Sequence, residues 1–245
     1  MAPTLQFTFS EKMLASSPRS MPVYTATIAA RYLEIPTATI RAWFFGMTYG
    51  NNKSSKFEPI FDPADAVNKL LSFDNLAEAY VYRLMRTRGL QASKIRKALE
   101  VVAKELNNEH PLVENRFLTD GIELFVKTVD GAKCVSSDKL FFDWYQAALD
   151  RVDWEDSIFA RFYPITRSVP QTQVEHQPKA ILIDPRIAFG ATAVASCRVS
   201  TKAIGDRYFS GESIVELSDD YGCGLLDIEE AVRTEWKFSR GTRAA

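Results

Sequence analysis

A stretch poor in apolar residues divides this chain into two patterned regions. Residues 165–179 are rich in proline, glutamine, threonine and serine, which is typical of a linker. Apolar periodicity runs through the residues before this stretch and resumes after it. Because 245 residues suffice for two small cores, we predict an arm at 1–22, a first folded region at 23–164 and a second at 180–245.

The first region opens with the pattern of two short helices. Thr25 can accept a hydrogen bond from an unpaired backbone N–H, so we predict a helix over 26–33. Pro36 suits the start of a second helix, which Gly46 can end. The inward face of that second helix comprises Ile40, Trp43 and Phe44. Two helices joined by so short a turn form a helix-turn-helix.

The segments after the second helix suggest a wing and a helical middle part. A polar loop at 50–56 leads into a short edge strand at 57–60, and together they could form a wing. Further helices are predicted from Ser72 to Gly89 and from Ser93 to Asn107. Beyond them we predict a hairpin around Asp130-Gly131 and a helix from Asp138 to about Leu149.

The second region combines very short strands with three helices. Apolar residues around Ile181, Ile187, Phe189, Val194 and Val199 predict two or three strands. Ser200 caps the first helix, a capping box of Ser213 and Glu216 starts the second, and the third runs from Leu226 to Phe238 with Trp236 inward. The predicted fold class is α+β and mostly helical, with a helix-turn-helix-like unit at each end.

Positive charge gathers near the first helix-turn-helix, although the whole chain carries a net charge of −1. Between Arg19 and Lys56 the cations exceed the carboxylates by four. Such a cluster can serve a site that binds nucleic acid, or it can be an ordinary solvated basic face.

Two stretches carry a resemblance to known families. The segment Tyr24-Thr25 to Thr39-Ile40-Arg41-Ala42-Trp43 resembles the first helix-turn-helix of MerR-like winged domains. Residues 180–236, from Ile181-Leu182-Ile183-Asp184-Pro185 through Arg198-Val199-Ser200-Thr201 to Asp227-Ile228-Glu229-Glu230-Ala231, resemble the bacterial unknown-function family 433. That family is predicted to supply the antitoxin in operons whose toxin is a PIN-like ribonuclease. The layout is similar to that of the longer VapB-type antitoxins.

The chain departs from the second family at three places. The family often has a proline where Thr192 or Ala193 stands. The family usually has a Gly-Thr-Arg turn where this chain has Ser196-Cys197-Arg198. Gly224 stands where the family usually has a serine or threonine that caps the last helix, and glycine is a tolerable N-cap.

The resemblance implies an antitoxin of a type II, VapBC-like system that binds operator DNA and neutralises its ribonuclease by direct contact. On the second predicted helix, Thr37 and Arg41 lie one turn apart, opposite the apolar face, where they can meet base edges. In the predicted wing, Lys53, Ser54 and Lys56 can reach phosphates.

The partner ribonuclease would meet the second region. PIN-like nucleases hold Mg²⁺ in a carboxylate cluster, which an inserted cation can occlude. Arg186, Arg198 and Arg207 are the candidate toxin-binding residues. The carboxylates of the last helices would repel phosphate, which favours assigning DNA to the first region and the toxin to the second.

The remaining composition argues against other classes of site. The three cysteines are far apart, which argues against a disulfide framework and fits a reducing cytoplasm. Two histidines and no paired cysteine spacing make a metal site improbable, and no cofactor is expected. No membrane span, signal peptide or nucleophile–base pair is recognised, so we expect a non-enzymatic cytoplasmic protein.

We expect a homodimer, because operator half-sites are usually read by two-fold partners. The main alternative is a MerR-like transcription regulator that senses a small molecule and has no toxin. An aromatic segment would then form its sensor, although the same residues can instead belong to a core or a subunit contact. The segment comprises Phe141, Phe142, Trp144, Tyr145, Trp154, Phe159, Phe162 and Tyr163. A second alternative is an interaction protein whose helix-turn-helix units serve assembly only.

Overall fold

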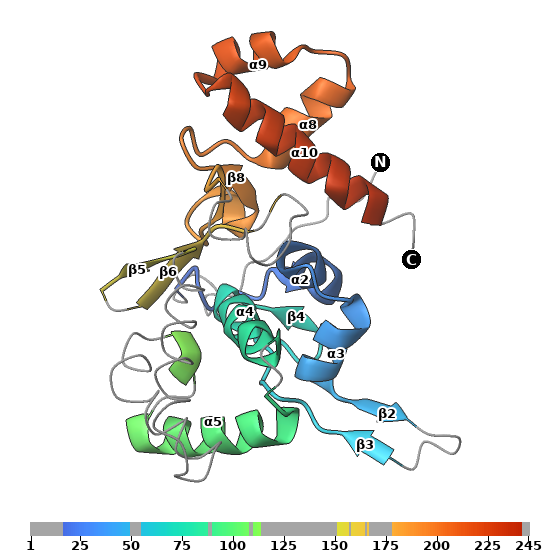
Figure 1. Ribbon diagram of the computed structural model, residues 1–245, viewed down its shortest axis with the longest axis vertical. Coiled ribbons are helices and arrows are strands. Elements are labelled where there is room, and N and C mark those ends of the chain that lie inside the picture. The colour runs from blue at the N-terminus through green and yellow to red at the C-terminus, as the bar shows by residue number, and fades with distance from the viewer. Residues whose placement is uncertain are drawn as a thin grey trace, which may run out of the picture.

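The computed structural model describes residues 17–49, 55–87, 90–107, 110–113, 151–156, 158–164, 166 and 178–241. Its elements form a lower part that contains the first helix-turn-helix and an upper part of three helices (Figure 1). The predicted hairpin at Asp130-Gly131, the helix from Asp138 and the part of the aromatic segment at 141–145 lie outside the described residues.

The predicted helix-turn-helix is present with the expected bounds. Helix α2 spans Ala26–Leu33, and the Thr25 hydroxyl oxygen accepts a 3.2 Å hydrogen bond from the Ile28 N–H. Helix α3 spans Thr37–Phe45 and ends at Gly46, whose φ of 68° favours glycine. Thr25 belongs to strand β1, Tyr24–Thr25, which pairs antiparallel with β4, Leu70–Leu71.

A hairpin follows α3 and projects from the molecule (Figure 1). Strand β2, Met47–Tyr49, pairs antiparallel with β3, Ser55–Phe57. The strand predicted at 57–60 is therefore misplaced, because pairing ends at Phe57. The chain then turns back to α3, where the N–H groups of Ile60 and Phe61 both donate to the Trp43 carbonyl, at 2.6 and 3.2 Å.

Two long helices support the helix-turn-helix. Helix α4, Phe73–Thr87, buries Phe73, Leu76 and Tyr80. Helix α5, Ala92–Leu106, precedes a short 3₁₀ helix η1 at Pro111–Val113. Helix α5 begins after Gln91 rather than at Ser93, so Ser93 lies within its first turn.

Aromatic side chains form much of the core of the lower part. Trp43 and Tyr82 meet edge to face with ring centroids 4.7 Å apart, and Tyr80 stacks on Phe162 at 5.4 Å. Phe159 and Phe162 belong to β6, so the core continues from the helices to a sheet. Aromatic contacts of this kind add to the stabilisation from buried apolar area.

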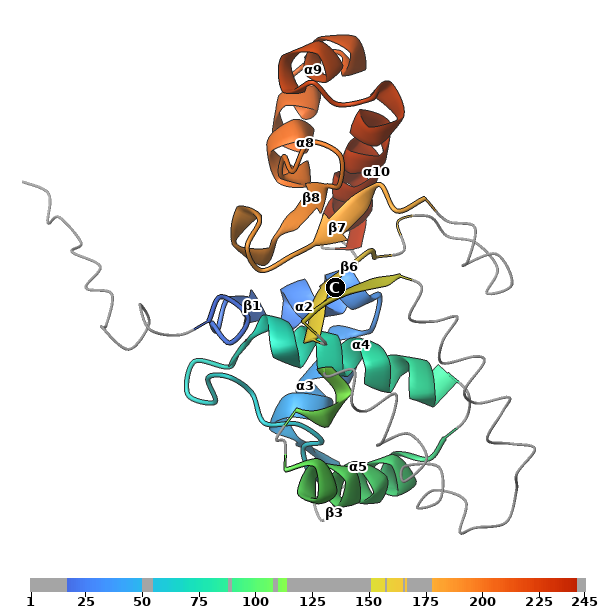
Figure 2. The ribbon, with the colours of Figure 1, turned by 90° about the vertical axis from the view of Figure 1, so that its left-hand side faces the viewer.

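A four-stranded antiparallel sheet connects the two regions of the chain (Figure 2). Strands β5, Val152–Glu155, and β6, Ile158–Phe162, precede the predicted linker. Strands β7, Ile181–Ile183, and β8, Thr192–Val194, follow it. Phe162 on β6 pairs with Ile183 on β7, so residues on both sides of the predicted linker share one sheet.

The three predicted helices of the second region are present. They are α8, Thr201–Phe209, α9, Ile214–Tyr221, and α10, Leu225–Gly241. The capping box of Ser213 and Glu216 is confirmed by both of its hydrogen bonds, whereas Ser200 occupies its N-cap position without a side-chain bond. The helices enclose a core of their own, which includes Ile181, Val194, Ile204, Leu217 and Ile228.

Three expectations for this region are wrong. No strand forms at 187–189, where a 3₁₀ helix η4, Ala188–Gly190, stands instead. Trp236 is 51% exposed, because the faces of α10 that pack inward carry Ile228 and Ala231. Val199 lies outside β8.

Cys197 and Cys223 form a disulfide, contrary to the expectation from their spacing. They are 26 residues apart in sequence, but the turn after β8 and the turn between α9 and α10 bring their Cα atoms to 5.7 Å. That separation is ordinary for a disulfide. Only the folding of the three helices brings the two turns together, so the sequence spacing could not reveal it.

No helix within the described residues has the length and apolar character needed to cross a membrane.

Candidate nucleic-acid interface

Helix α3 presents one polar face outward because its other faces are buried. The Pro36 carbonyl accepts the N–H groups of Thr39 and Ile40, at 2.9 and 3.2 Å, and so starts the helix. Ile40, Ala42, Trp43 and Phe44 are buried. The same helix leaves Arg41 exposed and Thr37 half-buried.

Arg41 is available for a ligand. Within the described part of the chain, no hydrogen bond or ion pair engages its guanidinium, and the residue is exposed. Thr37 lies one helical turn before it on the same helix. A guanidinium can donate two hydrogen bonds to a guanine edge, and a hydroxyl can contact a base or a phosphate. The structure therefore leaves the Arg41 guanidinium exposed and the Thr37 hydroxyl half-buried on the outward side of α3.

The hairpin of β2 and β3 supplies a second exposed surface beside α3. Lys56 lies opposite Thr48 in the register, and its ammonium pairs with the Glu58 carboxylate at 2.9 Å. That carboxylate partly offsets the charge of Lys56. Lys53 and Ser54, the other predicted wing residues, lie outside the described residues.

Sequence reasoning missed two exposed side chains on the hairpin. Met47 is 47% exposed and Tyr49 is 53% exposed, and both lie on β2. A tyrosine at such a place can donate its hydroxyl to a phosphate oxygen. The signal was present in the sequence as an aromatic residue directly before the polar loop, but the strand was expected only after that loop.

Helix α4 is hydrogen-bonded to the end of α2. Arg83 on α4 donates to the Leu33 carbonyl at the end of α2. The Ile35 N–H donates to the Ala30 carbonyl at 3.0 Å and closes the turn before α3. Arg83 thus has a structural partner in this fold, and the end of α2 and the turn before α3 are each held by a hydrogen bond.

Of the three arginines predicted to bind a toxin, Arg186 is engaged within the chain. Its guanidinium donates to the Asp184 carboxylate at 2.8 Å and to the Glu155 carboxylate at 2.6 Å. These hydrogen bonds hold the pKa of Arg186 above its usual value. The contact with Glu155 ties the loop after β7 to β5.

Arg207 has a similar set of partners on the helical unit. It donates to the carboxylates of Glu212 and Asp220, the latter at 2.6 Å, and lies over the Tyr221 ring at 5.0 Å. Hydrogen bonds to Glu212 and Asp220 raise the pKa of its guanidinium. Arg207 therefore braces α8 against α9.

Arg198 differs from the other two. The residue is exposed, and within the described residues its side chain has no ion pair or hydrogen bond. Its backbone has a φ of 60°, in the turn next to the disulfide residue Cys197. The structure therefore does not bring the three arginines into one cluster of free cations, and Arg198 alone is unengaged among them.

A cavity of about 720 Å³ lies between α4, α5 and the segment 59–64. Glu78 lines it and is 2% exposed, with its carboxylate 2.9 Å from His110 Nδ1. Burial raises the pKa of Glu78, against the lowering effect of the bond to His110. In the described residues, no group of three or more His, Cys, Asp or Glu side chains could hold a metal ion.

Comparison with known protein families gives one match in each of the two regions of the chain. Residues 22–99 match the family described as "Putative DNA-binding HTH domain". Residues 181–233 match the family described as "Protein of unknown function (DUF433)". The first match covers the helix-turn-helix, the hairpin, α4 and the first half of α5. The second runs from β7 to the first half of α10.

Longer similarities extend over both regions. The chain is 24% identical over 231 residues to "Putative antitoxin VapB45" of Mycobacterium tuberculosis (strain ATCC 25618 / H37Rv), which covers 86% of this chain and 93% of that protein. The crystal structure of Rv2018 from Mycobacterium tuberculosis matches with a TM-score of 0.61 at 20% identity, over 86% of this chain and 98% of that chain, and shows a shared fold. The chain carries an N-terminal helix-turn-helix DNA-binding domain followed by a C-terminal DUF433 domain.

Proposed function

We propose that this chain is the antitoxin of a VapBC-like toxin–antitoxin pair. It binds operator DNA through α3 and the hairpin, and it neutralises a PIN-like ribonuclease by direct contact through the C-terminal domain. The observation that carries the proposal is the exposed polar face of α3, with Arg41 unengaged, in a chain whose full layout is similar to "Putative antitoxin VapB45". The protein acts as a cytoplasmic homodimer and has no catalytic activity of its own.

The DNA part of the proposal follows from the chemistry of two adjacent elements. Helix α3 enters the major groove, where Arg41 and Thr37 meet base edges. The hairpin of β2 and β3 follows the phosphate backbone with Lys53, Ser54 and Lys56. Lys56 exchanges Glu58 for a phosphate oxygen when DNA binds, since that ion pair is exposed and weak.

The toxin part of the proposal rests on exposed groups of the C-terminal domain. Arg198 is the favoured cation for a nuclease carboxylate cluster, because Arg186 and Arg207 would first have to leave their own carboxylates. Phe189 is 91% exposed on the loop that also carries Arg186. Exposed aromatic side chains are enriched at protein interfaces.

Co-expression with the neighbouring genes tests both parts. The chain carries an affinity tag, the co-purified protein is identified by mass spectrometry, and its ribonuclease activity is measured before and after removal of the tagged chain. We expect a small nuclease that is silent in the complex and active alone. A gel shift with the chain's own upstream duplex tests the DNA part. If no adjacent nuclease binds and the duplex is not retarded, the proposal is wrong.

The cavity favours one alternative, a transcription regulator that senses a small molecule. It is lined by the buried pair of Glu78 and His110, and by segment 59–64, which is bonded to the end of α3. A ligand in this cavity could thus alter the hairpin. This alternative predicts operator affinity that changes with a small molecule and not with a neighbouring nuclease.

A further inference from the structure

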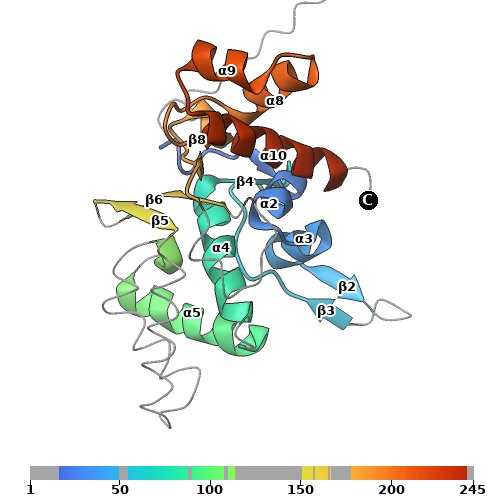
Figure 3. The same ribbon diagram turned by 45° about the horizontal axis from the view of Figure 1, so that its top comes forward.

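The C-terminal half of α10 lies against the first helix of the helix-turn-helix (Figure 3). The Phe238 ring packs on the Tyr32 ring, with centroids 5.6 Å apart. The Arg31 guanidinium lies 5.3 Å from the centroid of the same Phe238 ring. The Lys237 ammonium forms an ion pair with the Glu34 carboxylate. The C-terminal domain therefore contacts the DNA-binding domain at a defined place.

The Glu34 carboxylate lies close in sequence to the start of α3. Glu34 is the C-cap residue of α2, with a φ of 52°, and stands two residues before Pro36, where α3 begins. It is also the sole carboxylate in the sequence between Arg19 and Lys56. An unpaired negative charge next to the start of a recognition helix would repel DNA phosphates. Lys237 offsets that charge from a position 203 residues away in the sequence.

The charged residues of α10 are distributed unevenly along the helix. Asp227, Glu229 and Glu230 lie near its start, which is next to α9, whereas Lys237 lies near its end. Figures 1 and 3 show the end of α10, α3 and the hairpin on the same side of the molecule. The half of α10 that carries Arg233, Glu235 and Lys237 thus lies on the side of α3 and the hairpin, whereas the start of α10 lies next to α9.

We propose that Lys237 belongs to the DNA-binding surface, where it neutralises Glu34 and removes a local repulsion of phosphate at the start of α3. The inference rests on the proposed DNA binding and adds the C-terminal domain to it. Operator affinity then depends on α10 being docked on α2. A helix-turn-helix domain without its C-terminal domain would present Glu34 uncompensated.

A double-mutant cycle tests the proposal in the full chain. Lys237→Met, Glu34→Gln and the double variant are titrated against a fluorescent duplex of the chain's own upstream sequence, by anisotropy at two salt concentrations. We expect Lys237→Met to weaken binding about fivefold at low salt, the effect of one exposed charge pair. In the Glu34→Gln background the same change should alter binding less than about twofold.

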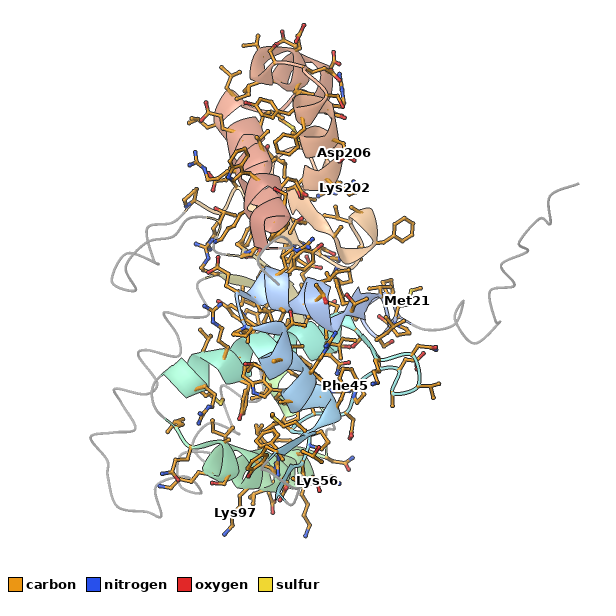
Figure 4. All side chains as sticks on the ribbon, turned by 90° about the vertical axis from the view of Figure 1, so that its right-hand side faces the viewer. Met21, Phe45, Lys56, Lys97, Lys202 and Asp206 are labelled. Carbon is orange, nitrogen blue, oxygen red and sulfur yellow. A yellow bond between two sulfur atoms is a disulfide. The ribbon has the colours of Figure 1, made fainter. Side chains whose placement is uncertain are left out.

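Two control variants separate charge from packing. Lys202→Met removes an equivalent cation that pairs with Asp206 at 2.6 Å on α8, and it should leave binding unchanged. Figure 4 shows that pair well apart from Phe45 and Lys56. Phe238→Leu weakens the docking contact without changing charge. If Lys237→Met acted through packing, adding Glu34→Gln to it would not restore duplex binding. The melting temperature of Lys237→Met would then fall as that of Phe238→Leu does.

The outcomes distinguish this inference from the proposed function. If Lys237→Met lowers duplex affinity equally in the wild-type and Glu34→Gln backgrounds, or in neither, the role of Lys237 is overturned. The proposed function still stands in that case if Arg41→Ala weakens duplex binding. A wild-type chain that does not bind the duplex overturns the proposed DNA binding and the inference with it.

Discussion

The exposure of Arg41 is set by its neighbours rather than by its own chemistry. Helix α3 has only nine residues, and Ile40, Ala42, Trp43 and Phe44 are all buried. The side chain between them along the sequence must therefore point outward. At the scale of single residues, the sequence could predict this much, because the apolar period fixes the outward face.

Arg41→Ala should weaken binding to the upstream duplex by about 1–3 kcal/mol if Arg41 contacts a base edge. The melting temperature should change little, because the side chain is exposed and has no hydrogen bond or ion pair with the described residues. Gel-shift titration of the two proteins measures the difference, with Lys202→Ala as a control of equal charge change. An affinity equal to that of the wild type would remove Arg41 from the interface.

Phe189 shows a backbone that the sequence did not suggest. Ala188, Phe189 and Gly190 have φ values of 49°, 54° and 77°, so three successive residues adopt the left-handed conformation. A residue with a Cβ pays about 1–2 kcal/mol for that conformation. Alternating apolar residues predicted a strand here, and pattern alone cannot reveal a conformation imposed by the tertiary contacts of a loop.

Phe189→Gly should therefore raise the free energy of unfolding by about 1 kcal/mol, since glycine tolerates the left-handed region and the lost side chain is 91% exposed. Urea unfolding of both proteins measures the change. Val67→Gly is the control, because Val67 is 89% exposed and does not have a positive φ. If Phe189→Gly lowered the free energy of unfolding by more than Val67→Gly does, the left-handed conformation would not be the source of strain in this loop.

At the scale of elements, the sequence predicted helices well and strands less well. Local signals fix the helix ends: the Thr25 cap, the capping box at Ser213 and the glycine stop at Gly46 are all present. Of the hairpin, one strand was predicted a few residues too late and β2 was missed, because a strand of three residues has too little pattern to locate it. Contacts between distant turns, such as the disulfide at Cys197, leave no local signal.

Gly46 links α3 to the hairpin and should be intolerant of a side chain. Its φ is 68°, and a Cβ there would lie 2.8 Å from the Phe57 carbonyl oxygen. Gly46→Ala should lower the free energy of unfolding by about 1–3 kcal/mol and weaken operator binding as the hairpin shifts. Thermal unfolding and gel shift are the measurements. Gly211→Ala is the comparison, since its φ is also positive but nothing lies within 4 Å. Equal effects would show that the hairpin contact is unimportant.

At the scale of the whole molecule, one sheet and one ion network connect the regions that the sequence separated. Asp184 is 1% exposed and accepts hydrogen bonds from Arg186, which also reaches Glu155 on β5. Arg161 on β6 lies 3.3 Å from Asp184. The predicted linker is bridged by these contacts, which the sequence could not reveal because they join charges from separate strands.

The network gives stability a defined dependence on pH. Burial by itself would raise the pKa of Asp184, but hydrogen bonds from Arg186 outweigh it and hold that pKa below 3.8. The folded state therefore favours the ionised form, and the resulting stabilisation is complete above pH 3.8 and is lost as pH falls through the lowered pKa. The Asp184→Asn protein should be less stable than the wild type near neutral pH and should lose less stability than the wild type on acidification. If the unfolding free energies of the two proteins, measured with urea, fell in parallel with pH, this explanation would be wrong.

If one chain joins an operator-binding domain to a toxin-binding domain, its complex with the nuclease must bind the upstream duplex while the nuclease stays inactive. A titration of the purified nuclease–chain complex with that duplex tests this. Anisotropy of the labelled duplex follows binding at two salt concentrations, while RNA cleavage is recorded in the same samples. We expect tight, salt-sensitive binding of the complex with no cleavage. Cleavage at full saturation with the chain, or a duplex that stays free at low salt, would contradict it.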